Sequence, residues 1–305
     1  MTGTPNPISS ETHDALLAAG LRPEAVVSFI AGCLDEDLDG GVDVTSVSTI
    51  DAADTSEAAF VVRRSGVLAG VPVLRAALES QLPSGSEITI LLTDGVAVSR
   101  GDIIATVRAR TIPLLTVERT ALNIMCRLSG VATHTRRWVD ALAGTSCQVR
   151  DTRKTTPGMR DLDKYAVRCG GGVNHRRGLS DAVLIKDNHV VAAGGVGEAV
   201  DRARTYVASL GKAMVVQCEI DRLEQLDEAI DHGATQILLD NMSNDEMSQA
   251  VQRAKLRNPA ILLEASGGLT IDSAASVAAT GVDFIAVGAL THSSPILDIA
   301  LDFRT

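Results

Sequence analysis

The chain has 305 residues, 45% hydrophobic and 22% charged, which is long and apolar enough for one or two globular domains and excludes a disordered chain. It carries 28 basic and 38 acidic residues, a formal net charge of −10, and few aromatic rings: one Trp, two Tyr and four Phe. An acidic chain with so few stacking rings is not expected to bind nucleic acid.

Cysteine usage and the N-terminus bear on location. The five cysteines are scattered without a Cys-x-x-Cys pair, so neither a complete disulfide framework nor a zinc cluster is expected. The N-terminus lacks the basic and apolar segments of a signal peptide, and no apolar run reaches the ~18–20 residues of a membrane span. We therefore expect reduced thiols, no membrane partner and a cytoplasmic protein.

The first part of the chain mixes helical and strand-like segments. Helices are expected over 13–34 and 71–81, and short strands over 58–63, 88–93, 96–99 and 103–108. Turn signals such as Asp94-Gly95 separate the strands. This pattern predicts an α+β domain with antiparallel hairpins.

One acidic motif in this region resembles the start of a calcium-binding loop. It reads Asp35-x-Asp37-x-Asp39-Gly40, but the twelfth position is Ser46 where such loops have Glu. Residues 44–50 are β-like rather than helical, so calcium is not expected here.

From residue 116 the pattern changes. A long helix is expected over 116–128 and 131–142, followed by alternating strands and helices. Strands are expected over 148–151, 182–186, 214–219, 236–240, 260–264 and 283–288, and helices over 196–210, 223–233, 245–256 and 271–281. Apolar, β-branched strands alternating with helices predict parallel βα units.

These strands share the way they end, at a charged residue or a glycine. The terminal residues are Asp151, Lys186, Glu219, Asp240, Glu264 and Gly288. In a parallel α/β barrel, strand ends of this kind lie together on the carboxyl-terminal rim, where active sites are built. We expect the functional site on that rim.

A basic segment supplies one part of this site. Residues 150–177 hold eight Arg or Lys against three Asp, a local charge of +5 that leaves −15 for the rest of the chain. Thr and Gly are interleaved with the cations, and hydroxyls, backbone amides and guanidinium groups together suit phosphates and carboxylates. The segment predicts a small, multiply anionic ligand; the alternative is a solvated charged face.

Glycine-rich turns supply another part. Ser266-Gly267-Gly268 precedes a helix expected from Ile271, and such a turn can hold a phosphate with backbone amides. Gly288, one βα unit later, is expected to form the adjoining wall.

Three strand-end side chains and one histidine complete the candidates. Glu219 and Asp240 suit Mg²⁺ beside a phosphate; the alternative is that they pair with Lys186. Lys186 itself is either a Schiff-base amine or an anion-binding ammonium, and the surrounding acids favour the second because they keep its charged form stable. His175, inside the basic segment, is a candidate donor to a ligand.

Several stretches together resemble one known family, the quinolinate phosphoribosyltransferases. The resemblance rests on EDLDGGVDVTS (36–46), ERTALNIMCRLSGVAT (118–133), DTRKTTPGMRDLDKYAVRCGGGVNHRRGLSDAVLIKDNH (151–189), ILLDN (237–241), ASGGL (265–269) and GVDFIAVGALTHS (281–293). It covers nearly the whole chain, and its long central motif is highly specific.

The resemblance implies both the fold and the reaction. It implies an α/β fold with an N-terminal α+β sandwich domain (1–119), an irregular, open, TIM-like α/β barrel (120–290), and a tail (about 291–305) packed on the first domain. The implied reaction joins quinolinate to phosphoribosyl pyrophosphate with Mg²⁺, giving nicotinate mononucleotide, pyrophosphate and CO₂ for NAD synthesis. It also implies a homodimer in which Arg119 enters the site of the partner subunit.

The resemblance assigns roles to residues of this chain. Lys154, Lys186, Glu219 and Asp240 are the implied catalytic residues, and Glu219 and Asp240 the implied Mg²⁺ ligands, directly or through water. The implied substrate-binding set is Arg119, Arg153, Lys154, His175, Arg176, Lys186, Glu219, Asp240, Ser266, Gly267, Gly268 and Gly288. The family often has Glu-x-Glu where this chain reads Gln217-Cys218-Glu219, so Gln217 receives no role.

Three alternatives stay open at this point. The first is a related transferase for another substrate, such as the pyrophosphorylase-like protein of molybdenum-transport operons, which would alter the arginine set. The second is a Schiff-base lyase acting through Lys186. The third is an anion-binding module that binds quinolinate without releasing pyrophosphate.

Overall fold

The computed structural model describes residues 6–304 as two compact units. The first residues of the stretch used for the signal-peptide prediction lie outside this range. One unit holds the chain up to Arg136, Thr156–Gly171 and the chain from Ser293; the other holds Arg137–Thr155 and Gly172–His292. The expected domain edges at 119–120 and 290–291 stay predictions.

The N-terminal helical region differs from its prediction. The helix expected over 13–34 is two helices, α1 (Ser10–Ala18) and α2 (Pro23–Leu38). Gly20 between them has a φ of +73°, and Pro23 occupies the first turn of α2. Because proline lacks an N–H donor, it begins a helix more readily than it continues one.

The β-like prediction for 44–50 is wrong. Val44–Thr49 forms the short helix α3, whose N-cap Asp43 accepts a hydrogen bond from the Ser46 backbone N–H at 3.0 Å. This capping bond satisfies a backbone N–H at the start of the helix and so stabilises it. The β-branched residues of the segment had indicated a strand because their propensity does not include capping. Asp35 and Asp37 of the calcium-like motif lie within α2.

The sheet of the first unit is antiparallel. Its strands are β1 (Thr55–Val62), β3 (Glu87–Ile90), β5 (Ile103–Arg110) and β12 (Ile299–Arg304), in the order β12-β1-β5-β3. A second hairpin pairs β2 (Gly66–Val67) with β4 (Ala97–Val98). The β12 pairing brings the C-terminal segment alongside β1.

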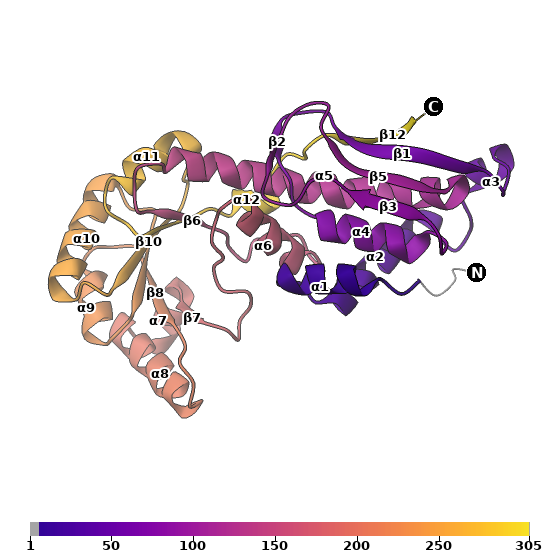
Figure 1. Cartoon of the computed structure of the whole chain (residues 1–305). Helices are drawn as coiled ribbons and strands as arrows, with labels where there is room; N and C mark the ends of the chain where they lie inside the picture. The colour runs from indigo at the N-terminus through magenta and orange to yellow at the C-terminus, as the bar shows by residue number, and fades with distance from the viewer. Residues whose placement is uncertain (1–5, 305) are drawn as a thin grey trace. The chain divides into compact units, whose positions relative to one another are not determined.

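Helices cover this sheet. It lies on one side of α4 (Val71–Gln81) and of the 31-residue helix α5 (Thr111–Ala141), and α1 and α2 pack on the far side of α4 (Figure 1). Phe60 and Leu74 are among the side chains fully or almost fully buried there. The helix α6 (Arg160–Cys169), which the sequence analysis did not predict, belongs to the same unit.

The second unit is a parallel α/β structure, as predicted. Its sheet order is β6-β11-β10-β9-β8-β7, formed by β6 (Gln148–Arg150), β7 (Val183–Ile185), β8 (Val216–Ile220), β9 (Gln236–Asp240), β10 (Leu262–Ser266) and β11 (Phe284–Ala286). All five strand pairings are parallel, and β6 and β7 are edge strands that do not pair with each other in the described chain. The sheet is therefore open, and its carboxyl ends share one edge.

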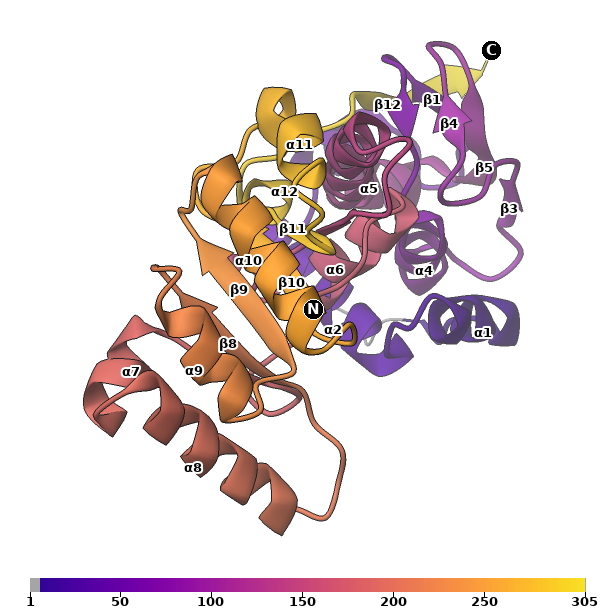
Figure 2. The same ribbon diagram turned by 90° about the vertical axis from the view of Figure 1, so that its left-hand side faces the viewer.

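Helices between these strands run along the outside of the sheet. They are α7 (Asp187–Ala193), α8 (Val196–Ser209), α9 (Gln225–Asp231), α10 (Asn244–Arg257) and α11 (Ile271–Ala278). The short helix α12 (Ala289–His292) follows β11, the last of these strands. Figure 2 shows α8 to α11 following one another beside β8 to β11.

Within residues 6–304, no single helix is long and apolar enough to cross a bilayer, although α1 and α2, bent by 106°, have the length and composition of a span as a pair. That is weak evidence, because core helices and signal sequences pass the same test.

Candidate active site

A cavity of about 310 Å³ opens at the carboxyl ends of the parallel strands. Its walls come from all six strands or from the loops that follow them. The lining residues are Thr152, Arg153, Lys154, His175, Arg176, Leu184, Lys186, Glu219, Leu238, Glu264, Ser266 and Ala286. We call this the rim pocket.

Two arginines of the rim pocket have unmet donors. The Nε atoms of Arg153 and Arg176 are buried and have no hydrogen-bond partner in the described chain. Burial lowers the pKa of Arg176, and the like charge of Arg153 lowers it further. Because an arginine stays protonated in proteins, the pocket holds two partly desolvated positive charges that an anionic ligand would satisfy.

A lysine and a glutamate form an ion pair in the same pocket. Lys186 follows β7, Glu219 lies on the neighbouring strand β8, and the Lys186 ammonium donates to the Glu219 carboxylate. The Lys186 side chain is 45% exposed, whereas that of Glu219 is 14% exposed. The ammonium therefore keeps access to solvent and to a bound molecule while Glu219 holds it in place.

The glycine turn after β10 is shaped by Asn241. Asn241 adopts a left-handed φ of +56°, its N–H donates to the Ser266 carbonyl at 2.9 Å, and its amide donates to an Asp240 carboxylate oxygen at 2.7 Å. A Cβ atom on Gly267, whose φ is +92°, would lie 2.1 Å from Asn241 Oδ1. Glycine is therefore required here both for its backbone conformation and for space.

Gly288 is packed against Lys154. A Cβ atom added at Gly288 would lie 2.9 Å from Lys154 Cδ, and Thr291 Oγ1 donates to the Lys154 carbonyl at 2.8 Å. A glycine after β11 thus lets the lysine stem pass close to the backbone. The lysine amine can then reach the rim pocket from a fixed stem.

A second cavity of about 260 Å³ shares one wall with the rim pocket. Glu219 lines both cavities, and Asp240 and Asp221 line the second. No cluster of three or more His, Cys, Asp or Glu residues able to hold a metal exists within residues 6–304. Two carboxylates alone suit Mg²⁺, which commonly takes one or two protein carboxylates and fills its shell with substrate oxygens and water.

The structure brings together most of the residues singled out from the sequence. Arg153, Lys154, His175, Arg176, Lys186, Glu219 and Ser266 all line the rim pocket, Asp240 lines the adjoining cavity, and Gly267, Gly268 and Gly288 lie in the loops beside them. Arg119 belongs to the other unit, where it is exposed on α5. The functional roles of these residues stay predictions.

Five lining residues were not assigned to the site from the sequence. They are Thr152, Leu184, Leu238, Glu264 and Ala286. Glu264 was recognised as a strand end, and that position was the signal that could have placed it here. The apolar members, Leu184, Leu238 and Ala286, carry no chemical signature, and only the folding of β7, β9 and β11 into one sheet brings them to the pocket.

Two family models match consecutive parts of the chain. Residues 43–129 match the family model for the N-terminal domain of quinolinate phosphoribosyl transferase, and residues 131–302 match the model for its C-terminal domain. The chain is 47% identical over 280 residues to the nicotinate-nucleotide pyrophosphorylase (carboxylating) of Mycobacterium leprae, covering 92% of this chain and 97% of that one. It is 42% identical over 267 residues to the probable enzyme of the same name from Bacillus subtilis, covering 88% and 89%.

Solved structures agree with the sequence relatives. The nicotinate-nucleotide pyrophosphorylase from Francisella tularensis superimposes with a TM-score of 0.87 at 36% identity, covering 93% of this chain and 98% of that one. The Streptococcus pyogenes protein named NadC gives a TM-score of 0.85 at 33% identity, covering 93% and 99%. Fold and sequence similarity thus extend over nearly the whole of both chains.

Proposed function

The chain belongs to the quinolinate phosphoribosyltransferase family, and on that premise we propose how its rim pocket performs the family's reaction. It is an enzyme of NAD biosynthesis that transfers a phosphoribosyl group to quinolinate with loss of a carboxyl group. The rim pocket supports this best through one observation: Arg153 and Arg176 each have a buried Nε donor without a partner in the described chain.

Quinolinate is a pyridine dicarboxylate, and its charges match those of the rim pocket. Each carboxylate can accept a charged, forked hydrogen bond from a guanidinium group. Arg153 and Arg176 supply those forks, and Lys186 adds a third positive charge at the next strand end. Binding would pair donors that the protein leaves unpartnered.

The phosphoribosyl donor is expected to occupy the neighbouring loops. The Ser266-Gly267-Gly268 turn and Gly288 offer backbone amides to phosphate oxygens, and Lys154 lies beside them. Glu219 and Asp240 face the same region and would stabilise positive charge developing on the ribose ring.

The reaction then requires positioning rather than a covalent nucleophile. The ring nitrogen of quinolinate attacks the anomeric carbon of the ribose, and the bond from that carbon to pyrophosphate breaks with its electron pair leaving on oxygen. The nitrogen becomes positively charged and stabilises the electron pair left on the adjacent carbon when CO₂ departs, and that carbon is then protonated. The cations of the rim pocket hold the carboxylates still while these bonds change.

Mg²⁺ is proposed as the metal of the donor substrate. When bound, it neutralises charge on the leaving pyrophosphate. Glu219 and Asp240 would hold it, directly or through water, because hard oxygen ligands suit this ion and both carboxylates line one cavity. Thermal stabilisation by Mg²⁺ with pyrophosphate, lost in Asp240→Asn, tests the ligand role without requiring turnover.

A homodimer is proposed as the working assembly. Arg119 is exposed on α5, and a dicarboxylate substrate can use a further cation. We propose that Arg119 serves the site of the partner subunit. Mixing inactive Arg119→Ala with inactive Lys186→Ala should restore part of the activity if subunits exchange and sites are shared, whereas mixtures without recovery would contradict the proposal.

A cytoplasmic location is also proposed. All five cysteines are free in the structure, which is typical of a reducing compartment. Fractionation of cells that express the untagged protein would test this.

The proposed reaction is tested by one assay. Purified protein with quinolinate, phosphoribosyl pyrophosphate and Mg²⁺ should form nicotinate mononucleotide and release CO₂ and pyrophosphate in equal amounts. Turnover of nicotinate in place of quinolinate would show that the substrate assignment is wrong. Binding of quinolinate without pyrophosphate release would show that the protein is a binding module.

A further inference from the structure

A buried chain of hydrogen bonds forms the floor of the rim pocket. Gln217 on β8 and Glu264 on β10 are 2% and 1% exposed, so both are shielded from bulk water. Gln217 Nε2 donates to Glu264 Oε2 at 2.8 Å, and Arg150 Nη1 donates to the same oxygen at 3.0 Å. On its other side, Gln217 Oε1 lies 2.9 Å from His175 Nε2.

The chemistry of these groups fixes which atom donates at each link. Glu264 Oε2 already accepts a hydrogen bond from Arg150, and the Gln217 atom that donates to it is the NH₂ group. The atom facing His175 is then the amide oxygen, which can only accept. His175 Nε2 must therefore carry the proton.

The other ring nitrogen gives the same answer independently. His175 Nδ1 accepts a hydrogen bond from the Arg176 backbone N–H at 2.7 Å, so Nδ1 holds no proton. The His175 backbone N–H is in turn anchored to Asp151 Oδ1 at 2.8 Å, and Asp151 is fully buried. Both ring nitrogens thus have protein partners, and the ring that lines the pocket is a neutral imidazole in one tautomer.

We propose that Gln217 is a positioning residue for recognition of quinolinate: together with the Arg176 backbone N–H it holds His175 in the Nε2–H tautomer, and it fixes the ring in one orientation against the substrate. This inference rests on the proposed function for the identity of the ligand, but not for the tautomer. It also changes the expected part of His175, which presents an oriented ring to the pocket rather than an unused N–H donor.

The residue type at this position matters for the whole chain of bonds. The Gln217 amide donates to Glu264 and accepts from His175 at once, which neither an ionised carboxylate nor an apolar side chain can do. A carboxylate in its place would face Glu264 at hydrogen-bond distance, and two like charges so close cannot both remain ionised without cost. An apolar side chain would leave the His175 N–H and one Glu264 bond unmade in a buried site.

The tautomer is measured first, without substrate. In protein labelled with ¹⁵N-histidine, the His175 signals are those that disappear in His175→Phe. The inference expects a protonated Nε2 and an unprotonated Nδ1 in the wild type. A protonated Nδ1 in the wild type would overturn it, whatever substrate the enzyme uses.

Steady-state kinetics then separates positioning from general stability. Gln217→Met keeps the side-chain length but removes both hydrogen bonds, and it should raise KM for quinolinate about tenfold, the value for one to two lost buried hydrogen bonds. KM for phosphoribosyl pyrophosphate should not change. Cys218→Ala, at the fully buried neighbouring position on β8, should lower stability but leave both KM values unchanged.

A double-mutant cycle completes the test. If Gln217 acts through His175, Gln217→Met should add nothing to KM in a His175→Phe background. Additive effects would overturn the inference, as would an unchanged His175 signal in Gln217→Met. If the protein proves to use another substrate, the wild-type tautomer and the changed His175 signal in Gln217→Met would still stand, so failure of the proposed function is distinguishable.

Discussion

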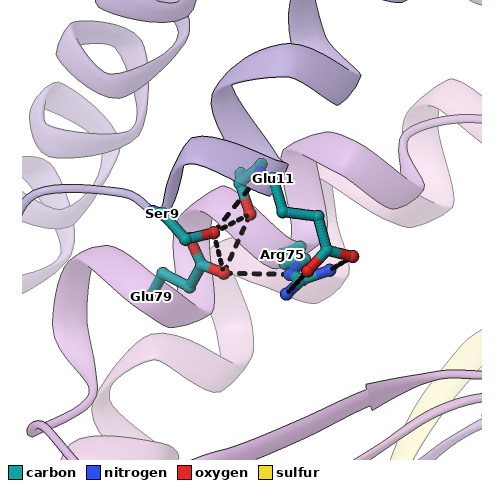
Figure 3. Close-up of polar contacts among 5 residues, drawn as sticks. Ser9, Glu11, Arg75 and Glu79 are labelled. Atoms are coloured by element: carbon teal, nitrogen blue, oxygen red, sulfur yellow. Dashed lines mark hydrogen bonds and ion pairs between the residues drawn. The ribbon is translucent and has the colours of Figure 1, made fainter.

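Arg75 of the first unit and the two arginines of the rim pocket have contrasting surroundings. In the first unit, Arg75 of α4 forms a two-pronged ion pair with Glu11 of α1, and its Nε donates to Glu79 at 2.9 Å (Figure 3). Ser9 donates to Glu79 through both its backbone N–H and its hydroxyl, at 2.8 and 2.9 Å. In the rim pocket, Arg153 and Arg176 keep buried Nε donors without any partner in the described chain.

The pKa values of Arg75 and Arg176 shift in opposite directions. Hydrogen bonding to Glu11 raises the pKa of Arg75, whereas burial lowers that of Arg176. Burial by itself would raise the pKa of Glu79, but hydrogen bonds from Ser9, Thr12 and Arg75 bring it below its ordinary value. Arg75, whose guanidinium nitrogens all donate to protein partners, joins two helices and has no nitrogen left for a ligand. Arg153 and Arg176, which we call unsaturated, each keep a donor that a ligand can use.

The largest expected effect concerns the turn that shapes the pocket. Gly267→Ala places a Cβ against Asn241 and imposes a left-handed φ on alanine, so the turn must shift. A displacement of about 1 Å at a substrate loop can lower kcat/KM about 100-fold. Steady-state kinetics measures this.

Gly144→Ala is the matched control. Gly144 has a φ of +84° but open space around its Cβ position. The control should lose a similar amount of stability without losing activity. Equal losses of activity in the two variants would show that backbone strain, and not the contact with Asn241, lowers the activity.

Next in size is the removal of an unsaturated arginine. Arg153→Ala should lower kcat/KM for quinolinate at least about tenfold, because a charged hydrogen bond contributes about 1.5–3 kcal/mol. The free energy of unfolding should stay the same or rise, since a desolvated charge beside Arg176 is lost. Unchanged kinetics would remove Arg153 from the substrate site.

Removal of Arg75, whose guanidinium nitrogens are all paired, should lower stability and leave activity unchanged. Arg75→Met should lower the free energy of unfolding by about 1 kcal/mol, because it removes partly exposed ion pairs and hydrogen bonds. Its kcat/KM should match the wild type. Urea denaturation measures the stability and kinetics on the same preparation measures the activity. A loss of activity at full stability would show that Arg75 serves the active site and would contradict the contrast with Arg153.

The smallest effect is a pH dependence of stability. Because the folded pKa of Glu79 is lowered, its contribution is fully present above the ordinary carboxyl pKa and is lost as pH falls through the folded value. Wild-type stability should therefore fall more steeply on acidification below about pH 4 than that of Glu79→Gln. Parallel curves from urea titrations would show that Glu79 contributes nothing through its charge.

Much of the second unit was predictable because its signals are local. Six apolar strands with polar ends indicated a parallel sheet, and parallel strands place their carboxyl ends on one edge. Lys186, Glu219 and Asp240 could therefore be assigned to one edge of the sheet from the sequence alone. The first unit was less predictable: the break between α1 and α2 and the helix α3 depend on single residues, Pro23 and the N-cap Asp43.

The sequence by itself determined the six parallel strands of the second unit, the basic segment, the family and nearly all the charged residues of the rim pocket, because each has a local pattern or a residue type that carries chemistry. Tertiary structure decided which cations are satisfied, since hydrogen bonds between distant segments saturate Arg75 and leave Arg153 short of a partner. It also decided the part of Gln217, whose two partners are 42 and 47 residues away along the chain. No local sequence pattern reveals these partners, because a buried amide acquires its role from the groups that the fold places on either side of it.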